Sequence, residues 1–503
     1  MAVPKIVGVE TEYGIVHRGV AESNPITASS LLINAYLVDN RGTDRAGPAR
    51  NVTWDFEDEM PANDARGFSP MGAMAPEVET HLVNAVLTNG ARYYVDHAHP
   101  ELSTPECADA RSVVIFDKAA ELIMRQSMEA AVRLLPDGEE IICYKNNSDG
   151  KGNSYGTHEN YLMDRNTPFS QIVTHATAHF ITRQIFTGAG KVGTEAPGLS
   201  HQDVPYQLTA RADFFEEQVG LETTLKRPII NTRDEPHADA QRYRRLHVII
   251  GDANMSEVST YLKVGTTAIV LAMIEDDCIG RQFSFHAPVQ TLRQVSYDLS
   301  LSEPLRMADD STMTALEVQW ELLRFAQKYR DDHGLEAVGE DVGNDILTRW
   351  ENVLTALETD PMSLADQLDW VAKKKLLDAY RERDDMAWND HRLRALDLQY
   401  SDMRARKSVF DRLGVERIST DAEAETAIGL PPTDTRAYFR GQCLRRWPND
   451  IVAANWDSLV FDLGDEPLRR VPMMEPTRGT EVHVGTLLDE SSSAADLLRR
   501  LDG

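Results

Sequence analysis

Two short acidic motifs hold the residues of this sequence that are best suited to chemistry. Glu10 and Glu12, in GVETEYG, stand two positions apart, so on a strand both carboxylates project from one face. In ARYYVDHAHPELSTPE, Tyr94 and Asp96 also share a face and Glu101 follows on the turn. Clustered oxygen ligands of this kind suit Mg²⁺, which reaches a substrate through phosphate oxygens. Asp96, beside such a cluster, stays ionised and can serve as nucleophile or base, whereas a solvated strand face and a capped turn are the plainer alternatives.

Two histidines and several arginines extend this pattern. His158 and His247 are each predicted at the start of a strand, where a single histidine is more often structural than a ligand. Together with the acidic motifs they indicate strand ends that converge on a divalent metal. Guanidinium groups match phosphate oxygens in pairs, and the candidate phosphate clamps are Arg211, Arg227, Arg233 and Arg242.

Two familiar patterns occur in settings that do not suit them. Residues 152–156 spell G-x-S-x-G, but a polar loop precedes Ser154 and a strand follows it, where a nucleophile elbow needs strand, turn and helix. Residues 188–193 spell G-x-G-x-x-G after a helical stretch, where a dinucleotide fingerprint needs a strand. Neither motif predicts catalysis or dinucleotide binding here.

Composition narrows the class of protein. The 503 residues contain 52 Lys and Arg against 80 Asp and Glu, a net charge of −28, which disfavours binding to nucleic acid or to anionic membranes. The hydrophobic fraction of 42% is that of a globular chain. The four cysteines form no CxxC pair, the N-terminus has no signal-peptide pattern, and the longest apolar run spans residues 268–274. We therefore expect a soluble protein of the reducing cytoplasm.

The predicted elements place the motifs on strand ends. Strands are expected at residues 5–16, 91–101, 140–144, 158–163 and 247–252, and helices at 29–36, 112–135, 171–186 and through most of 314–412. Residues 39–80 lack periodicity and are expected to be a long, functional loop insertion. A boundary near residue 431 predicts a domain over 1–430 and a small C-terminal domain over 431–503.

The motifs in this order resemble the carboxylate–amine ligases related to glutamine synthetase and γ-glutamylcysteine ligase. More closely, the chain is similar to the Pup-processing family, which contains Pup ligases and Pup deamidases/depupylases. The resemblance rests on GVETEYGI, ARYYVDHAHPELSTPE, SYGTHENYL, RDEPHADAQRYRRLHVIIGDANMSE and RGQCLRRWPNDIVAANWDSLVFD, which cover nearly the whole chain. It implies an α+β fold, with a glutamine-synthetase-like antiparallel curved sheet packed with helices and a small C-terminal domain.

The resemblance also implies roles for individual residues and cofactors. Asp96 becomes the catalytic carboxylate, and ATP and Mg²⁺ the cofactors. The metal ligands it implies are Glu10, Tyr94 and Glu101, with His158 and His247 near the metal and phosphates. The implied ATP contacts are Arg92, Thr104 and Trp456, to which the phosphate clamps Arg211 and Arg227 are added.

Within the family, the insertion at 39–80 and the spelling DHAHPE favour the deamidase and depupylase branch. The implied reaction is ATP- and Mg²⁺-dependent hydrolysis of the C-terminal Gln of Pup to Glu, and of the isopeptide bond between Pup and a lysine of a pupylated protein. Pup would bind a groove with Arg440, Arg445 and Arg446. Three alternatives remain: a Pup ligase that forms this bond with ATP, a non-catalytic Pup-binding scaffold, and a small-molecule γ-glutamyl ligase.

Overall fold

A long mixed sheet forms the frame of the protein. The computed structural model describes residues 1–40, 48–57, 59–67, 82–464 and 467–502. Within them, ten strands join in one curved sheet, which is antiparallel except where β3 meets β16. In spatial order these are β13 (Tyr243–Val248), β8 (Thr157–Asp164), β1 (Val7–Glu12), β6 (His99–Ser103), β5 (Arg92–Asp96), β4 (Asn84–Leu87), β3 (Pro48–Trp54), β16 (Ile451–Ala454), β17 (Ser458–Phe461) and β18 (Arg469–Pro472).

Alternation along the strands gives this sheet two different faces. In β1, Val7, Val9 and Thr11 are buried while the intervening Glu10 and Glu12 are only partly covered. In β5, Tyr93 and Val95 join the core on the helical side, while Tyr94 between them is buried on the opposite face. One face of the sheet therefore supplies the core, and the other presents the acidic residues.

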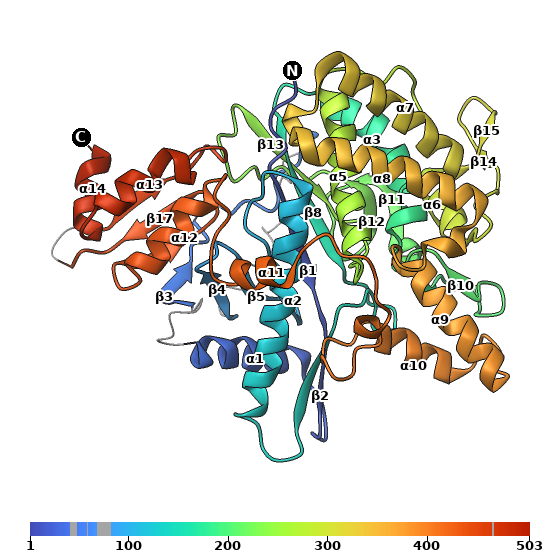
Figure 1. Ribbon diagram of the computed structural model, residues 1–503, viewed down its shortest axis with the longest axis horizontal. Coiled ribbons are helices and arrows are strands. Elements are labelled where there is room, and N and C mark those ends of the chain that lie inside the picture. The colour runs from blue at the N-terminus through green and yellow to red at the C-terminus, as the bar shows by residue number, and fades with distance from the viewer. Residues whose placement is uncertain (41–47, 58, 68–81, 465–466, 503) are drawn as a thin grey trace.

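Helices cover the core face. The long helix α2 (Ala110–Val132) lies along the sheet beside α1 (Pro25–Asp39), and the buried α5 (Glu257–Glu275) packs beyond it (Figure 1). The remaining helices are α3 (Phe169–Thr182), α4 (Gln184–Thr187), α6 (Pro288–Tyr297), α7 (Ala315–His333), α8 (Glu340–Thr359), α9 (Asp369–Asp384), α10 (His391–Tyr400), α11 (Asp421–Ala427), α12 (Ala437–Arg446), α13 (Glu481–Glu490) and α14 (Ala494–Asp502).

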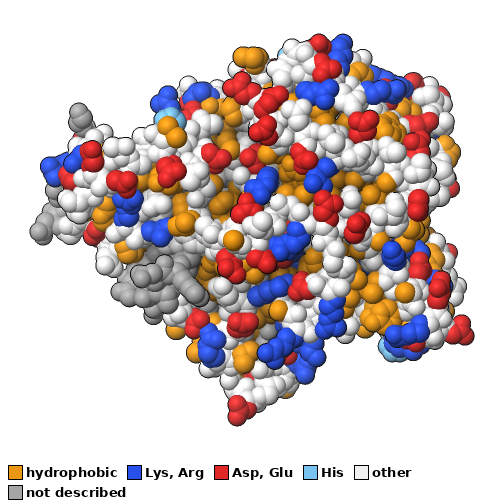
Figure 2. All heavy atoms as spheres, in the orientation of Figure 1, with side chains coloured by type: hydrophobic (Ala, Val, Ile, Leu, Met, Phe, Trp, Pro, Cys, Tyr) orange, Lys and Arg blue, Asp and Glu red, His pale blue; other side chains and the backbone are white. Residues whose placement is uncertain are grey.

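Helix α5 is long and apolar enough to cross a membrane by length and composition. The whole of that apolar stretch is buried inside the protein, which makes it a core helix here. On the surface view of Figure 2, acidic and basic side chains are interspersed across the whole visible face.

Short two-stranded ladders accompany the main sheet. They pair β2 (Gly14–Arg18) with β7 (Glu140–Tyr144), β9 (Lys191–Val192) with β10 (Tyr206–Gln207), β11 (Phe215–Gly220) with β12 (Arg227–Asn231), and β14 (Leu305–Arg306) with β15 (Thr312–Met313). The pair β11 and β12 is parallel, although only six residues connect the two strands. This unusual connection lies beside the acidic face of the sheet.

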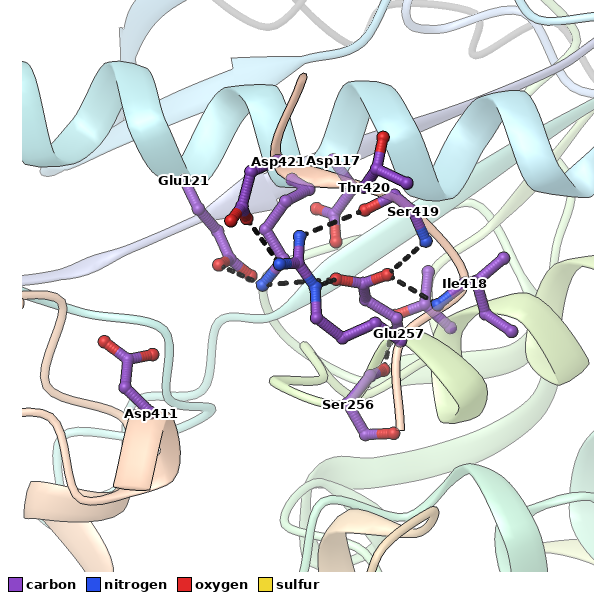
Figure 3. A network of polar contacts seen from close by, with 12 residues as sticks. Asp117, Glu121, Ser256, Glu257, Asp411, Ile418, Ser419, Thr420 and Asp421 are labelled. Carbon is purple, nitrogen blue, oxygen red and sulfur yellow. Dashed lines mark hydrogen bonds and ion pairs between the residues drawn. The ribbon is translucent and has the colours of Figure 1, made fainter. Parts of the chain in front are cut away.

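A charged network on the helical side fixes the chain between α10 and α11. Glu257, at the start of α5, accepts hydrogen bonds from the backbone of Ile418 at 2.8 Å and of Ser419 at 2.7 Å, and from Arg417 Nε at 3.0 Å. Figure 3 shows Glu257 facing Ser419, with Glu121 of α2 close by. The network stabilises the helical layer behind the sheet.

The predicted α+β class with a curved, mostly antiparallel sheet is confirmed. Three local expectations differ. Glu101, expected on the turn, lies within β6, because residues 97 and 98 alone form the turn between the two strands. Residues 48–54, expected to be irregular, form β3, while 41–47 and 68–80 of the predicted insertion lie outside the described residues. The strand expected at 247–252 lies at Tyr243–Val248, so His247 stands near its end. Apolar residues continue beyond the strand, and periodicity alone did not locate its end.

The boundary near residue 431 stays a prediction. Phe439, Leu444, Leu459 and Leu497 after it belong to a small core cluster, which also includes Val52, Trp54 and Val86 from before it. The strands after it also continue the main sheet, because β16 pairs with β3. Figure 1 shows this segment, in orange and red, at one end of the molecule.

Candidate active site

Strand register brings the two acidic motifs into one row. Glu12 of β1 lies opposite Glu101 of β6, and Glu101 lies opposite Tyr94 of β5. In the next row, Glu10 lies between Ser103 of β6 and His158 of β8. Side chains two residues apart share a face, so both rows point to the same side of the sheet.

Three carboxylates converge at the first row. Ligand oxygens of Glu12, Asp96 and Glu101 lie within 4.8 Å of one another. Glu101 is 2% exposed, and its burial, together with the nearby charges of Asp96 and Glu12, raises its pKa well above the usual range. A divalent cation relieves such repulsion, and three carboxylate oxygens are a donor set that fits Mg²⁺.

A second group of candidate ligands adjoins the first. Glu10, His158 and His247 offer ligand atoms within 4.8 Å of one another. Asn160 organises them, because its amide donates to Glu10 at 2.8 Å while its oxygen lies 2.9 Å from His247 Nδ1 and accepts from Arg245 at 2.5 Å. The structure thus brings together both predicted histidines and the acidic face.

The electrostatics keep the ligands of this group in forms that can hold a metal. Burial would raise the pKa of Glu10, but its hydrogen bond with His158 and the charge of Arg245 lower it well below the usual range. Burial and the charge of Arg245 depress the pKa of His247, which keeps the imidazole neutral. An ionised carboxylate and a neutral imidazole are the protonation states of metal ligands.

Asp96 stands at the last position of β5. His97, which follows it with a φ of +51°, places Nδ1 at 3.0 Å from an Asp96 oxygen. Burial would raise the pKa of Asp96, but the hydrogen bond and charge of His97 and the charge of His158 lower it below its usual range. The carboxylate is therefore ionised at neutral pH and available as base or nucleophile.

A first cleft of about 550 Å³ opens beside Glu10, Tyr94 and Asp96. On its wall the Arg92 guanidinium lies 3.9 Å from the Trp54 ring centroid and 4.0 Å from that of Tyr94. Trp456 packs edge-on against Trp54, with ring centroids 5.3 Å apart. The wall joins flat apolar rings to a cation, a chemistry that suits a purine base and its phosphates.

Thr104 directly follows the end of β6. Its hydroxyl accepts from the backbone N–H of Val9 at 3.1 Å, and it lines a small apolar pocket of about 80 Å³ with Gly8 and Trp456. Of the residues predicted to contact ATP, Arg92, Thr104 and Trp456 therefore gather at one end of the site.

A second cleft, of about 1060 Å³, opens on the other side of Asp96. Asp96, His97 and His158 line both clefts, while Arg211 and Arg227 line only the second. Two of the four candidate phosphate clamps thus lie across Asp96 from Arg92 and Trp456. Arg233 is the one that lines the first cleft.

Arg211 is held by backbone rather than by acids. It donates to the carbonyl oxygens of Ile249 at 2.7 Å and Gly251 at 2.8 Å, and burial together with the charge of Arg227 lowers its pKa to about 10. A Cβ at Gly156 would lie 2.7 Å from its guanidinium, so this approach needs glycine. Arg227 donates to the carbonyl oxygen of Ser154 at 2.8 Å.

Two arginine expectations are corrected by their positions. Arg242 forms an exposed ion pair with Glu475 and lines neither cleft. Arg440 is fully buried, paired with Glu106 and bonded to the carbonyl oxygen of Gly90 at 2.9 Å, so it is not part of a surface groove. Arg445 and Arg446 are exposed, and Arg446 pairs with Asp489 at 2.7 Å.

Ser154 lies in a loop, and the glycine motif lies in a turn. The Ser154 hydroxyl donates to the carbonyl oxygen of Asn147 at 3.1 Å and accepts from Arg211 at 3.1 Å, in a loop before β8. Gly190 and Gly193 have φ of +68° and +79° after α4, which are turn conformations. Both patterns are therefore structural, as their sequence context predicted.

Glu12, whose role the motif leaves open, and Asn160 and Arg245, which no motif singles out, also belong to this site. Each stands two positions from a residue with a predicted role, namely Glu10, His158 and His247. Strand alternation places such neighbours on one face, so the same reasoning could have found them.

Comparisons with known proteins find relatives that match nearly the whole chain. The chain is 50% identical over 509 residues to a depupylase of Acidothermus cellulolyticus and 47% identical to a Pup deamidase/depupylase of Mycolicibacterium smegmatis, with 99% of each chain covered in both cases. A Pup–protein ligase of Kineococcus radiotolerans is 39% identical over 415 residues, covering 81% of this chain and 90% of its own.

Solved structures agree in fold. The Pup ligase PafA in its complex with Pup matches 99% of this chain and 95% of its own, with a TM-score of 0.79 and 29% identity. PafA in complex with ADP matches 85% of this chain and 99% of its own, with a TM-score of 0.73 and 31% identity. A family model described as Pup-ligase protein matches residues 5–460, and the chain therefore belongs to the Pup-ligase family.

Proposed function

We propose that this protein is a hydrolase of carbon–nitrogen bonds that deamidates the C-terminal Gln of Pup to Glu and cleaves the isopeptide bond between Pup and a substrate lysine. The full-length identity of 47–50% to enzymes named for these activities carries the proposal. The ionised Asp96 at the junction of two clefts supports it, because a hydrolase of this kind needs one carboxylate beside the scissile carbonyl. Its partners are Pup and pupylated proteins, and its place is the cytoplasm.

ATP and Mg²⁺ are the proposed cofactors. Glu10, Tyr94 and Glu101, with His158 and His247, would hold the metal, and the crowded carboxylates around Glu101 support a cation there. ATP would contact Arg92 and Trp456, which line the first cleft, and Thr104, which lines the small pocket that shares Trp456 with it. Its phosphates would contact Arg211 and Arg227. When bound, the metal and the phosphates supply charge that stabilises an oxyanion at the scissile carbonyl.

The protein's own residues account for the proton transfers. Water adds to the carbonyl, the amide C–N bond breaks, and the amine leaves with a proton, so that a carboxylate and an ammonium result. Asp96 either takes a proton from that water or attacks the carbonyl itself, and His97 orients its carboxylate at 3.0 Å. Single turnover in H₂¹⁸O separates the two routes, because only direct attack leaves label on Asp96 after the anhydride is hydrolysed at the Asp96 carbonyl.

A Pup ligase is the second candidate. The same fold in PafA, at a TM-score of 0.79, favours it, since the two reactions use one kind of site. The ligase would consume one ATP for each bond formed, whereas the hydrolase would not. A non-catalytic scaffold would have no need of Asp96 beside a metal-binding cluster.

The decisive experiment follows Pup by mass. Pup ending in Gln is incubated with the protein, Mg²⁺ and ATP, and a gain of about one dalton without matching loss of ATP is expected, because an amide becomes a carboxylate. The Asp96→Asn variant is the matched control and should produce no shift. Coupling of Pup ending in Glu to lysine, at the expense of ATP, would instead establish the ligase.

A further inference from the structure

The short connection between β11 and β12 forms a strap across the active site. The strands are parallel, with Phe215 opposite Arg227 and Gly220 opposite Asn231, so the chain must return along the length of β11. That length is about 16 Å at ~3.3 Å per residue. The six residues 221–226, called the strap here, span at most about 22 Å when fully extended. The strap therefore has little spare length and bends on its way back, whereas parallel strands usually need a dozen or more connecting residues.

Both ends of the strap are fixed. The buried Asn231 side chain donates to the carbonyl oxygens of Leu221 at 3.1 Å and Glu222 at 3.3 Å. At the other end, Lys226 adopts a φ of +49°, a left-handed conformation that turns the chain into β12. The anchored ends and the short length hold the strap in place.

The strap separates the two clefts above Asp96. Leu221 and Glu222 line the first cleft, Leu225 and Lys226 line the second, and Thr223 and Thr224 line both. Since Asp96 and His158 also line both clefts, the reacting carbonyl must lie where the clefts meet, under the middle of the strap.

The second cleft suits an aliphatic chain that ends in a cation. Leu225 is 75% exposed, unusual for a leucine beside an active site, and Pro25, Pro197 and Val289 add apolar surface to the same cleft. Its walls also include six carboxylates, among them Glu12, Glu195 and Glu216. They outnumber the four cations of the cleft, which are Lys226, Arg293 and the proposed phosphate contacts Arg211 and Arg227. A lysine side chain has this form: its four-carbon stem packs on apolar groups, and the amine released from it becomes a cation.

We propose that Leu225 of the strap packs on the stem of the substrate lysine and makes the second cleft the leaving-group site for isopeptide cleavage. This assignment rests on the proposed function. It implies that Leu225 matters for an isopeptide, whose leaving group is a lysine, and not for a terminal Gln, whose leaving group is ammonia.

The test compares two substrates with a common Pup part. One is Pup ending in Gln, and the other is Pup joined through its terminal γ-carboxyl to Nε of a lysine in a short peptide. Leu225→Ala should lower kcat/KM for the isopeptide by about tenfold, mainly through KM, and leave deamidation within about twofold. Leu225→Met, which restores apolar contact, should recover most of the loss.

Leu134→Ala is the matched control, because Leu134 is 59% exposed just after α2 and lines neither cleft. An equal loss on both substrates, or no loss on either, would overturn the assignment of Leu225. If the unaltered protein acts on neither substrate, the proposed function itself fails. The two failures are therefore distinguishable.

Discussion

Glu12 and Glu101 lie directly opposite each other on adjacent antiparallel strands, with their carboxylates on one face. Two acids in this position repel each other, and burial of Glu101 increases the cost. The folded protein thus retains an unfavourable contact at the place where a divalent cation would remove it. This relationship explains why the same residues should control both metal binding and stability.

Glu101→Gln should accordingly have opposite effects with and without metal. In EDTA the free energy of unfolding of the variant should exceed that of the unaltered protein by at least about 1 kcal/mol, because one of two like charges is removed. Added Mg²⁺ should stabilise the unaltered protein and have little effect on the variant. Thermal and urea denaturation measure both effects, with Glu382→Gln, at an exposed position of α9, as the control. A variant that is less stable in EDTA would contradict the repulsion.

Asp96→Asn should lower the rate of Pup deamidation by about 10²–10⁴-fold, because the amide can neither accept a proton nor attack a carbonyl. Nucleotide affinity should change little, since Arg92 and Trp456 are untouched. Mass spectrometry of Pup and calorimetry with ATP measure the two properties. Full activity in the variant would remove Asp96 from the mechanism.

Arg92→Ala should weaken nucleotide binding by about tenfold, because it removes a cation that Trp54 and Tyr94 hold at the wall of the first cleft. Calorimetric titration with ATP and Mg²⁺ measures the affinity. Arg242→Ala supplies the control, since Arg242 is exposed and paired with Glu475. Equal effects of the two substitutions would indicate a general electrostatic contribution instead of a local contact.

Glu106 should make the stability of the protein depend on pH in the acid range. Burial alone would raise its pKa, but Arg440 and Arg436 lower it to about 2, against 4.5 for a free glutamate. A lowered carboxyl pKa contributes stability that is complete above pH 4.5 and is lost as the pH falls from 4.5 towards 2, about 3 kcal/mol in all.

The Glu106→Gln variant should therefore lose about 3–5 kcal/mol of its free energy of unfolding at pH 7, because two buried arginines are left without their carboxylate partner. Its stability should also depend less on pH between 4.5 and 2 than that of the unaltered protein. Urea denaturation across this range measures the slope, and Glu358→Gln on the exposed side of α8 is the control. An unchanged slope would show that other acids dominate the transition.

Much of the site was predictable because its spacing is local. Glu10 and Glu12, and Tyr94 and Asp96, share strand faces through alternation alone, and the hairpin that carries Glu101 follows within a few residues. The positions of the arginines were harder to predict. The sequence does not show whether a guanidinium lines a cleft, as that of Arg227 does, or is buried in an ion pair, as that of Arg440 is.

By itself, the sequence determined the faces of β1 and β5, the turn that presents Asp96, and the membership of a family, since these depend on neighbouring residues or on long shared strings. Only the tertiary structure decided that His158 and His247 meet Glu10, that Arg211 sits against Gly156, and that the strap divides two clefts. These relationships depend on strand order and on contacts between residues far apart in the chain. Local preference does not encode such contacts, because they form only when the sheet and its helices pack together.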